Sequence, residues 1–197
     1  MNQQLNEFYA EYCNIFAGEQ LVMGGGAQPV RLLLIGEAPG RDEVQQGRPF
    51  VGAAGKQLTA FLEGAGLERN EVYITNAIKY RLCRLNPKTG RLVNRPAKTE
   101  EISKNRVYLY REIDILNPEW IVTLGNVPLK ALCPDASPIS QVHGRLSKVN
   151  ILGRDYLHFP LYHPASVIYR RHLAEDYEKD MKILKKTLDK GVEGVVL

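Results

Sequence analysis

The sequence has few cysteines and no long apolar run. Its three cysteines, Cys13, Cys83 and Cys133, are odd in number and widely separated, which excludes a disulfide framework and predicts a reducing, cytoplasmic environment. No apolar run approaches the ~20 residues that a membrane-spanning helix needs. Met1 to Gln4 do not start a basic-then-apolar signal pattern. We therefore expect a cytoplasmic protein without a membrane partner.

Internal repeats and low-complexity linkers are also missing. The 197 residues, 44% hydrophobic and 24% charged, have the composition of a soluble globular protein. This length is enough to bury a sizeable core in one domain. We therefore predict a single domain over residues 1–197.

Acidic residues are absent between positions 79 and 98. The same segment carries seven basic residues, namely Lys79, Arg81, Arg84, Lys88, Arg91, Arg95 and Lys98. Charge of one sign suits a polyanion such as a nucleic-acid backbone; a solvated basic loop without a partner is the other interpretation, and the charge alone leaves both open. The turn signals Asn86-Pro87 and Thr89-Gly90 predict a long loop here.

Apolar runs alternate with amphipathic stretches along the chain. Buried strands are predicted at 31–35, 72–75, 120–124, 146–152 and 156–159, and helices at 4–16, 56–64, 99–116, 127–132 and 173–188. Thr99 is the expected N-cap of the helix that follows it. Strands that alternate with helices predict an α/β fold with a mainly parallel sheet and helices on both faces.

Several polar side chains follow the predicted strands directly. Glu37 comes after the first strand, in a loop framed by glycines and prolines that also carries Phe50. Asn76 follows the second strand and His163 follows the last. Each alone has an ordinary explanation, as a surface carboxylate, a core ring, a turn residue or a loop histidine. Their shared place beyond strand ends, where open α/β sheets form their sites, favours a functional site.

Three motifs around these residues resemble the uracil-DNA glycosylase superfamily, and most closely its fourth, iron–sulfur family. They are Gly36-Glu37-Ala38-Pro39-Gly40 with Gly47-Arg48-Pro49-Phe50-Val51-Gly52, then Ile74-Thr75-Asn76-Ala77-Ile78-Lys79, then Tyr162-His163-Pro164-Ala165-Ser166. The resemblance covers about residues 31–188. It implies a three-layer α/β/α fold with a central, mainly parallel four-stranded sheet. It also implies excision of uracil from DNA in base-excision repair.

The resemblance also assigns roles to individual side chains. Glu37 stands at the carboxylate that positions water and stabilises the cationic sugar. Phe50 stands at the ring that stacks on the flipped base, Asn76 at the side chain that reads the uracil edge, and Glu43 at an acidic position beside the base pocket. His163 stands at the group that contacts uracil O2.

The chemistry of uracil excision fits these residue types. Cleavage of the N-glycosidic bond leaves a sugar with oxocarbenium character and a uracil anion, which a carboxylate and a donor stabilise respectively. An Asn76 amide held in one orientation accepts from uracil N3–H and donates to O4. Cytosine presents the reverse pattern and would leave polar atoms unpaired.

Basic and apolar side chains near the motifs are expected to contact DNA. Val167, Ile168 and Tyr169 are candidates for a wedge into the duplex, although core packing is their ordinary role. The candidate phosphate contacts are Arg81, Arg84, Arg95, Arg170 and Arg171.

The iron–sulfur family holds a four-iron cluster with four cysteines, and this chain lacks most of them. Cys13 stands at one ligand position, whereas Phe16, Tyr80 and about Asn105 stand at the others. Because such clusters are normally held by four thiolates, we predict no cluster and no metal. Cys83 close to Tyr80 leaves open a rearranged site with a non-cysteine ligand. Loss of the cluster would also remove the anchor of the basic loop.

The leading hypothesis is a monomeric, metal-independent uracil-DNA glycosylase of a bacterial or archaeal nucleoid. A second hypothesis is a relative that recognises damaged DNA without cleaving it, or that prefers hypoxanthine or another deaminated base. A third is an unrelated α/β enzyme whose first loop binds a nucleotide phosphate. Glu37 would repel that phosphate, and the sequence has no Walker lysine pattern.

Overall fold

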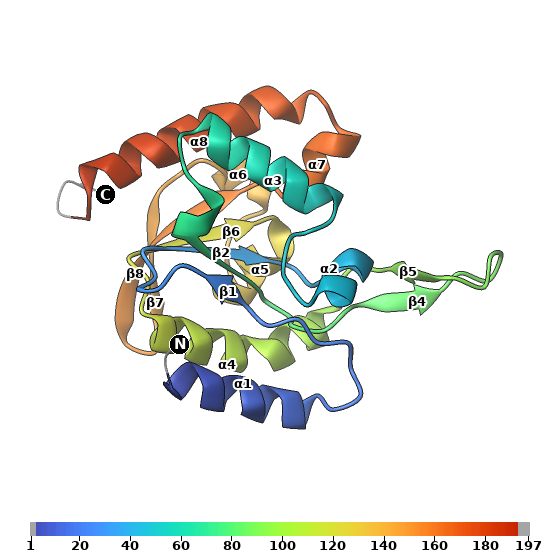
Figure 1. Ribbon diagram of the computed structural model, residues 1–197. Helices are drawn as coiled ribbons and strands as arrows, with labels where there is room; N and C mark the ends of the chain where they lie inside the picture. The colour runs from blue at the N-terminus through green and yellow to red at the C-terminus, as the bar shows by residue number, and fades with distance from the viewer. Residues whose placement is uncertain (1–2, 193–197) are drawn as a thin grey trace.

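A six-stranded sheet runs through the part of the protein that the computed structural model describes, residues 3–192 (Figure 1). Its strands, in spatial order, are β1 (Gly25–Gly26), β3 (Val72–Asn76), β2 (Leu32–Gly36), β6 (Trp120–Leu124), β8 (Arg154–Leu161) and β7 (Ser147–Ile151). The four central strands are parallel, and β1 and β7 pair antiparallel at the two edges. The expected four-stranded sheet is therefore the parallel centre of a wider one.

Helices cover both faces of the sheet, which confirms the predicted three layers (Figure 1). One face carries α1 (Gln3–Ile15), α4 (Thr99–Leu116) and α5 (Asn126–Leu132), and the other carries α3 (Ala53–Gly64), α7 (Pro164–Tyr169) and α8 (Leu173–Lys190). Three short elements, α2 (Arg41–Gln46), η1 (Arg69–Glu71) and α6 (Ile139–Val142), lie in the connections.

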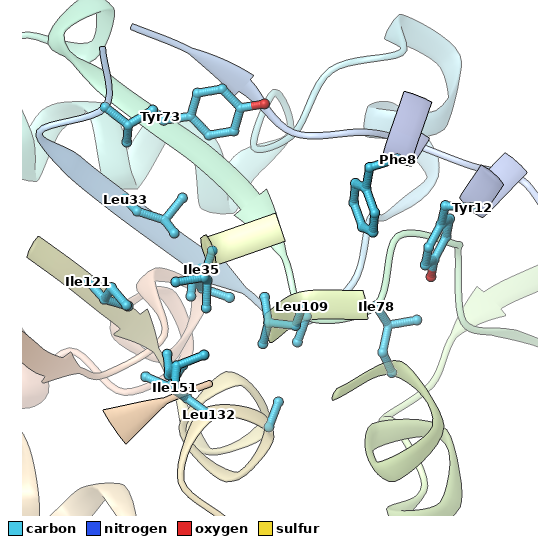
Figure 2. Close-up of a cluster of buried hydrophobic side chains, with 14 of the residues drawn as sticks. Phe8, Tyr12, Leu33, Ile35, Tyr73, Ile78, Leu109, Ile121, Leu132 and Ile151 are labelled. Carbon is cyan, nitrogen blue, oxygen red and sulfur yellow. The ribbon is translucent and has the colours of Figure 1, made fainter. Parts of the chain in front are cut away.

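Strand β2 divides its side chains between the two cores. Leu33 and Ile35 pack with α1 and α4, as Figure 2 shows, whereas Leu32 and Leu34 face α3 and α8. A strand that is buried on both faces is apolar throughout. This explains why the sequence has a continuous apolar run here.

Helix α4 and strand β6 have their predicted bounds, but the predicted N-cap is wrong. Thr99 is the first helical residue, and Lys98 is the N-cap. The Glu101 carboxylate accepts a hydrogen bond from the Lys98 backbone N–H at 2.8 Å. A carboxylate in the first turn thus reaches back to the N–H of the N-cap residue, as the third residue of a capping box does.

The basic segment forms a β-hairpin, so the predicted long loop is wrong. Strand β4 (Cys83–Leu85) pairs antiparallel with β5 (Leu92–Asn94), and the hairpin projects beyond the rest of the fold (Figure 1). The predicted turn signals lie at its tip, where the Gly90 N–H donates to the Asn86 carbonyl at 2.9 Å. Among the residues described, no helix is both long and apolar enough to cross a membrane.

Candidate active site

The structure gathers the polar residues that follow the strands. Gly36 at the end of β2 lies in register with Asn76 at the end of β3. A cavity of about 200 Å³ is lined by Ala38, Gly40, Glu43, Phe50, Ala54, Asn76, Asn94, His163 and Ala165. Glu37 and His163 both line an adjoining cavity of about 320 Å³. All five side chains predicted for catalysis and base recognition therefore line these two cavities.

Asn76 presents an unpaired oxygen at the cavity. Its side chain is 2% exposed, and its Oδ1 accepts no hydrogen bond from any described residue. A buried acceptor without a partner costs about 1–3 kcal/mol. An N–H group of a bound ligand would remove that penalty.

Phe50 forms part of the cavity wall in a strained conformation. Its φ is +55°, a left-handed value that costs an L-residue roughly 1–2 kcal/mol. Its ring centroid lies 5.9 Å from that of His163, with 32° between the planes. The residue at Gly36 must be glycine, because a Cβ there would lie 2.5 Å from both Phe50 Cε2 and Asn76 Oδ1.

His163 is the N-cap of α7, and the hydrogen bond that its ring accepts there determines its tautomer. Its Nδ1 accepts a hydrogen bond from the Ala165 backbone N–H at 3.1 Å. The proton of the neutral ring is therefore on Nε2. Burial lowers the pKa of His163 to about 4. His163 is thus a neutral donor at pH 7, a point that the sequence left open.

Glu37 lies between the end of β2 and the base of the hairpin. Its Oε1 accepts a hydrogen bond from the Ala97 backbone N–H at 3.0 Å, and its carbonyl accepts one from the Ile78 N–H at 3.0 Å. Burial raises the pKa of the Glu37 carboxyl above its ordinary value. A carboxylate with a raised pKa is a better acceptor for a proton from water.

Glu43 stabilises the loop between β2 and α3. Its two carboxylate oxygens accept hydrogen bonds from the backbone N–H groups of Gly40, Val51 and Gly52 at 2.8 to 3.1 Å. A Cβ at Gly40 would lie 2.7 Å from Glu43 Oε2. The carboxylate that the resemblance places beside the base pocket thus also maintains the shape of that pocket.

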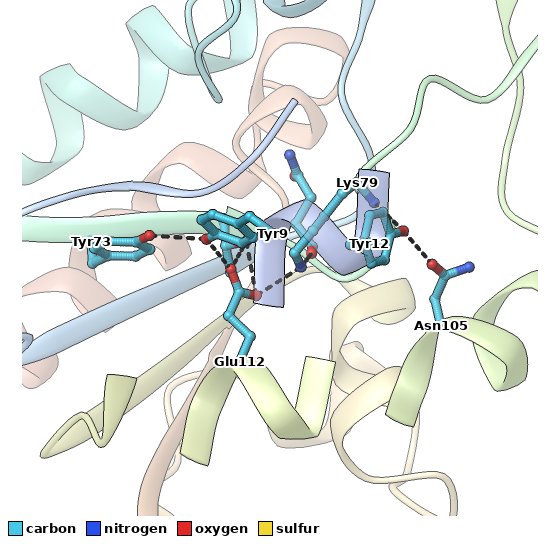
Figure 3. A network of polar contacts seen from close by, with 8 residues as sticks. Tyr9, Tyr12, Tyr73, Lys79, Asn105 and Glu112 are labelled. Atoms are coloured by element: carbon cyan, nitrogen blue, oxygen red, sulfur yellow. Dashed lines mark hydrogen bonds and ion pairs between the residues drawn. The ribbon is translucent and has the colours of Figure 1, made fainter. Parts of the chain in front are cut away.

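Lys79 and Glu112 form a buried ion pair (Figure 3). Lys79 Nζ lies 2.7 Å from Glu112 Oε2 and donates to the Asn76 carbonyl at 3.1 Å. The hydroxyls of Thr75 and Tyr9 donate to the same Glu112 carboxylate. Lys79 and Glu112 are 0% exposed. Lys79 is therefore buried and cannot face a polyanion, unlike the exposed basic residues of the segment 79–98. Its pairing with Glu112, which is distant along the chain, has no signal in the sequence.

The hairpin is attached to the site by two arginines. Arg81 is 9% exposed, and its Nε donates to Asn94 Oδ1 at 3.1 Å. Arg95 makes two hydrogen bonds to Glu101, at 2.6 and 2.8 Å. Two of the five arginines predicted to contact DNA thus also bond to the protein, and Arg84, Arg170 and Arg171 are exposed.

A groove of about 390 Å³ continues the site toward the hairpin. Arg81, Leu92, Asn94 and Ile168 are among its lining residues. Of the expected wedge residues, Val167 is buried in the core and Ile168 is exposed beside the groove. Asn94 lines all three cavities. No role was predicted for Asn94 from the sequence.

Aromatic rings occupy the region where the resemblance places cluster ligands. Phe16 and Tyr80 have ring centroids 5.2 Å apart. The Asn105 amide donates to Tyr80 Oη at 3.2 Å and accepts from Tyr12 Oη at 2.6 Å. These side chains are packed and hydrogen-bonded to one another, so they do not fit an iron–sulfur cluster. Within residues 3–192, no three His, Cys, Asp or Glu side chains group as metal ligands would.

The chain is similar to a known family and to several of its members. A family model described as Uracil DNA glycosylase superfamily matches residues 23–187. The type-4 uracil-DNA glycosylase of Archaeoglobus fulgidus is 41% identical over 165 residues, which are 82% of this chain and 78% of the relative. Those of Sulfurisphaera tokodaii and Thermotoga maritima are 39% and 35% identical, over 84% of this chain in both cases and over 73% and 84% of the relatives.

The strand-end cavity and these matches agree on the kind of protein. Open α/β sheets bind their ligands beyond the carboxyl ends of the parallel strands, where Glu37, Asn76 and His163 lie in this chain. The chain belongs to the uracil-DNA glycosylase superfamily.

We predict that Glu112→Ala destabilises the protein by about 3–5 kcal/mol, because it leaves Lys79 charged and unpaired in the core. Urea denaturation measures the loss. Glu11→Ala is the matched control, because it breaks the exposed pair between Glu11 and Arg111 and should leave the urea midpoint almost unchanged. Similar losses in the two variants would contradict this account of the buried pair.

We also predict that His163 makes the protein less stable as pH falls from about 6.5 toward 4. The unfolded histidine binds a proton near its ordinary pKa of 6.5, whereas the folded one stays neutral until about pH 4. Protonation therefore favours the unfolded state in this window. His163→Asn retains a helix-capping side chain and should show a shallower pH dependence in urea denaturation. The same slope in both proteins would show that His163 is not held neutral.

Proposed function

We propose that this protein is a uracil-DNA glycosylase that hydrolyses the N-glycosidic bond of uracil in DNA. The observation that carries the proposal is the pair of complementary groups in one cavity: an unpartnered, buried Oδ1 on Asn76 and a neutral Nε2–H donor on His163. Uracil offers an N3–H to the first and an O2 acceptor to the second. The relatives' names support the same activity.

Two residues of the site act on different parts of the substrate, His163 on the departing base and Glu37 on the water that attacks the sugar. The bond between C1′ and N1 breaks, and its electron pair leaves with the uracil ring. His163 donates a hydrogen bond to O2 as negative charge develops there, and because the histidine is neutral its Nε2–H remains a donor throughout. A water molecule then bonds to C1′, and Glu37, whose pKa is raised by burial, accepts its proton.

The base must leave the duplex before it can enter the cavity. Extrusion costs a few kcal/mol, and least at a mismatch or in a single strand. Stacking on the Phe50 ring returns about 1–3 kcal/mol of that cost. The exposed Arg84, Arg170 and Arg171 would hold the phosphates beside the groove, with Ile168 as the wedge. We further propose that the enzyme acts as a monomer and in the cytoplasm, a reducing compartment that suits its three unpaired cysteines.

We also propose that the protein works without an iron–sulfur cluster. Phe16, Tyr80 and Asn105 make up a packed, hydrogen-bonded cluster of their own in that region. The residues proposed for catalysis lie at the strand ends and need no metal for the roles described. Cys13 and Cys83 are free thiols.

The activity is tested with Asn76→Ala and His163→Asn, each of which should lower kcat about 10²–10³-fold by removing a group that binds the departing base. The substrates are labelled oligonucleotides with one uracil as single strand, U·A or G·U, cleaved by alkali after base loss. Among the duplexes, G·U should react faster because its uracil is flipped at lower cost.

Asn150→Ala, in β7 beside its turn to β8, is the control and should retain full activity. Wild-type protein that is folded and binds DNA but releases no uracil from any substrate would contradict the proposal. That result would indicate a recognition protein or another target base, and an oligonucleotide with hypoxanthine would distinguish them.

The cluster proposal predicts that protein purified without oxygen contains no iron or acid-labile sulfide and is fully active. Elemental analysis measures the iron. Cys13→Ser and Cys83→Ser should each retain the wild-type rate and thermal midpoint. About four irons per chain, the content of a four-iron cluster, would contradict the proposal. So would iron that is lost from either serine variant.

A further inference from the structure

Arg69 lies outside the cavity but bonds to the backbone of a residue that lines it. Arg69 is the first residue of η1. Its Nη2 donates to the carbonyls of Pro49 and Phe50, each at 2.9 Å. Its Nη1 donates to Thr59 Oγ1 at 3.2 Å, which ties the same guanidinium to helix α3. One planar side chain thus links two consecutive carbonyls of the site loop to the helix behind it.

Phe50 needs such support because its backbone is left-handed, with a φ of +55°. Conformations of this kind persist only where the surroundings over-determine them. Helix α3 supplies a second constraint, since a Cβ at Gly55 would lie 1.9 Å from the Phe50 carbonyl oxygen. The Phe50 carbonyl is therefore enclosed between Gly55 and Arg69, which fixes the backbone that carries the ring lining the cavity.

We infer that Arg69 is a positioning residue that holds the Phe50 ring where the flipped base stacks, an inference that rests on the proposed glycosylase function. Arg69 is not among the residues lining the cavity or the groove. Its effect on the reaction therefore passes through the backbone of Phe50. Loss of the guanidinium leaves both carbonyls without their donor and allows the turn to relax away from the strained conformation.

The chain offers a matched control for this arginine. Arg106 Nε and Nη2 donate to the carbonyls of Ala131 and Lys130 at 3.0 and 3.2 Å. Both arginines are half-buried and each bonds two consecutive carbonyls. Arg106 joins α4 to α5, away from the residues that line the site. A purely structural role would therefore give the two substitutions similar consequences.

The experiment compares Arg69→Met with Arg106→Met. Both should lower the thermal midpoint by similar amounts. Only Arg69→Met should lower kcat on a G·U oligonucleotide, by about tenfold, or about 1.4 kcal/mol of barrier. Its KM should stay within about twofold of wild type, because the phosphate contacts are unchanged. Equal kcat in the two variants would overturn the inference.

A double-mutant cycle with Phe50→Ala separates positioning from an independent effect. If Arg69 acts through the Phe50 ring, adding Arg69→Met to Phe50→Ala should lower kcat less than about twofold further. A full tenfold additional loss would overturn the inference. If Arg69→Met does not fold, Arg69→Lys replaces it. A kcat at least threefold below wild type with unchanged KM then supports the inference, and wild-type kcat overturns it.

If the proposed glycosylase function is wrong, the experiment gives a different result. In that case the wild-type protein itself releases no uracil from single-stranded, U·A or G·U oligonucleotides. An active wild type whose rate is insensitive to Arg69 leaves the glycosylase function intact and removes only the positioning role.

Discussion

The buried ion pair between Lys79 and Glu112 is the constraint on which the site depends. Each of these charges costs several kcal/mol to remove from water, and only close pairing with further hydrogen bonds offsets that cost. The structure supplies both, since Tyr9 from α1 and Thr75 from β3 donate to the carboxylate. Because Lys79 also donates to the Asn76 carbonyl, the end of β3 is fixed relative to two helices. Asn76, which is proposed to read the base, is thus placed by the core.

Close packing then determines what surrounds that amide. Gly36 lets Asn76 and Phe50 approach the end of β2 from two sides, and no other residue leaves room for both. Glu43 closes the loop that carries Phe50 by binding three of its N–H groups. His163 is held by the first turn of α7. The groups that line the cavity are therefore held by close packing and hydrogen bonds within the protein, as preorganised electrostatic stabilisation requires.

Local patterns predicted the parts of the fold that local forces determine. The amphipathic α4 and the apolar β6 have their expected bounds, and the strand ends carry the expected polar residues. Strand β1 is two glycines without a side-chain pattern, so only its pairing with β3 reveals it. The partnership of Lys79 with Glu112, and the hydrogen bonds from Arg69, join residues that are distant along the chain. Neither spacing nor composition encodes such contacts, so the supports of the site were not predictable.

The hairpin is held to the rest of the fold by bonds at its base. The basic segment was expected to lack an anchor, but Arg95 bonds to Glu101 in α4 and the Arg81 N–H donates to the Gln20 carbonyl. Two further bonds, from Arg81 to Asn94 and from the Arg95 N–H to the Leu82 carbonyl, join the two sides of the hairpin. These bonds begin where the hairpin meets Glu37, whose carboxylate accepts from Ala97. Charge-assisted hydrogen bonds are strong and directional, so they fix the basic arm relative to Glu37, and the proposed DNA contacts are thereby coupled to the proposed activation of water.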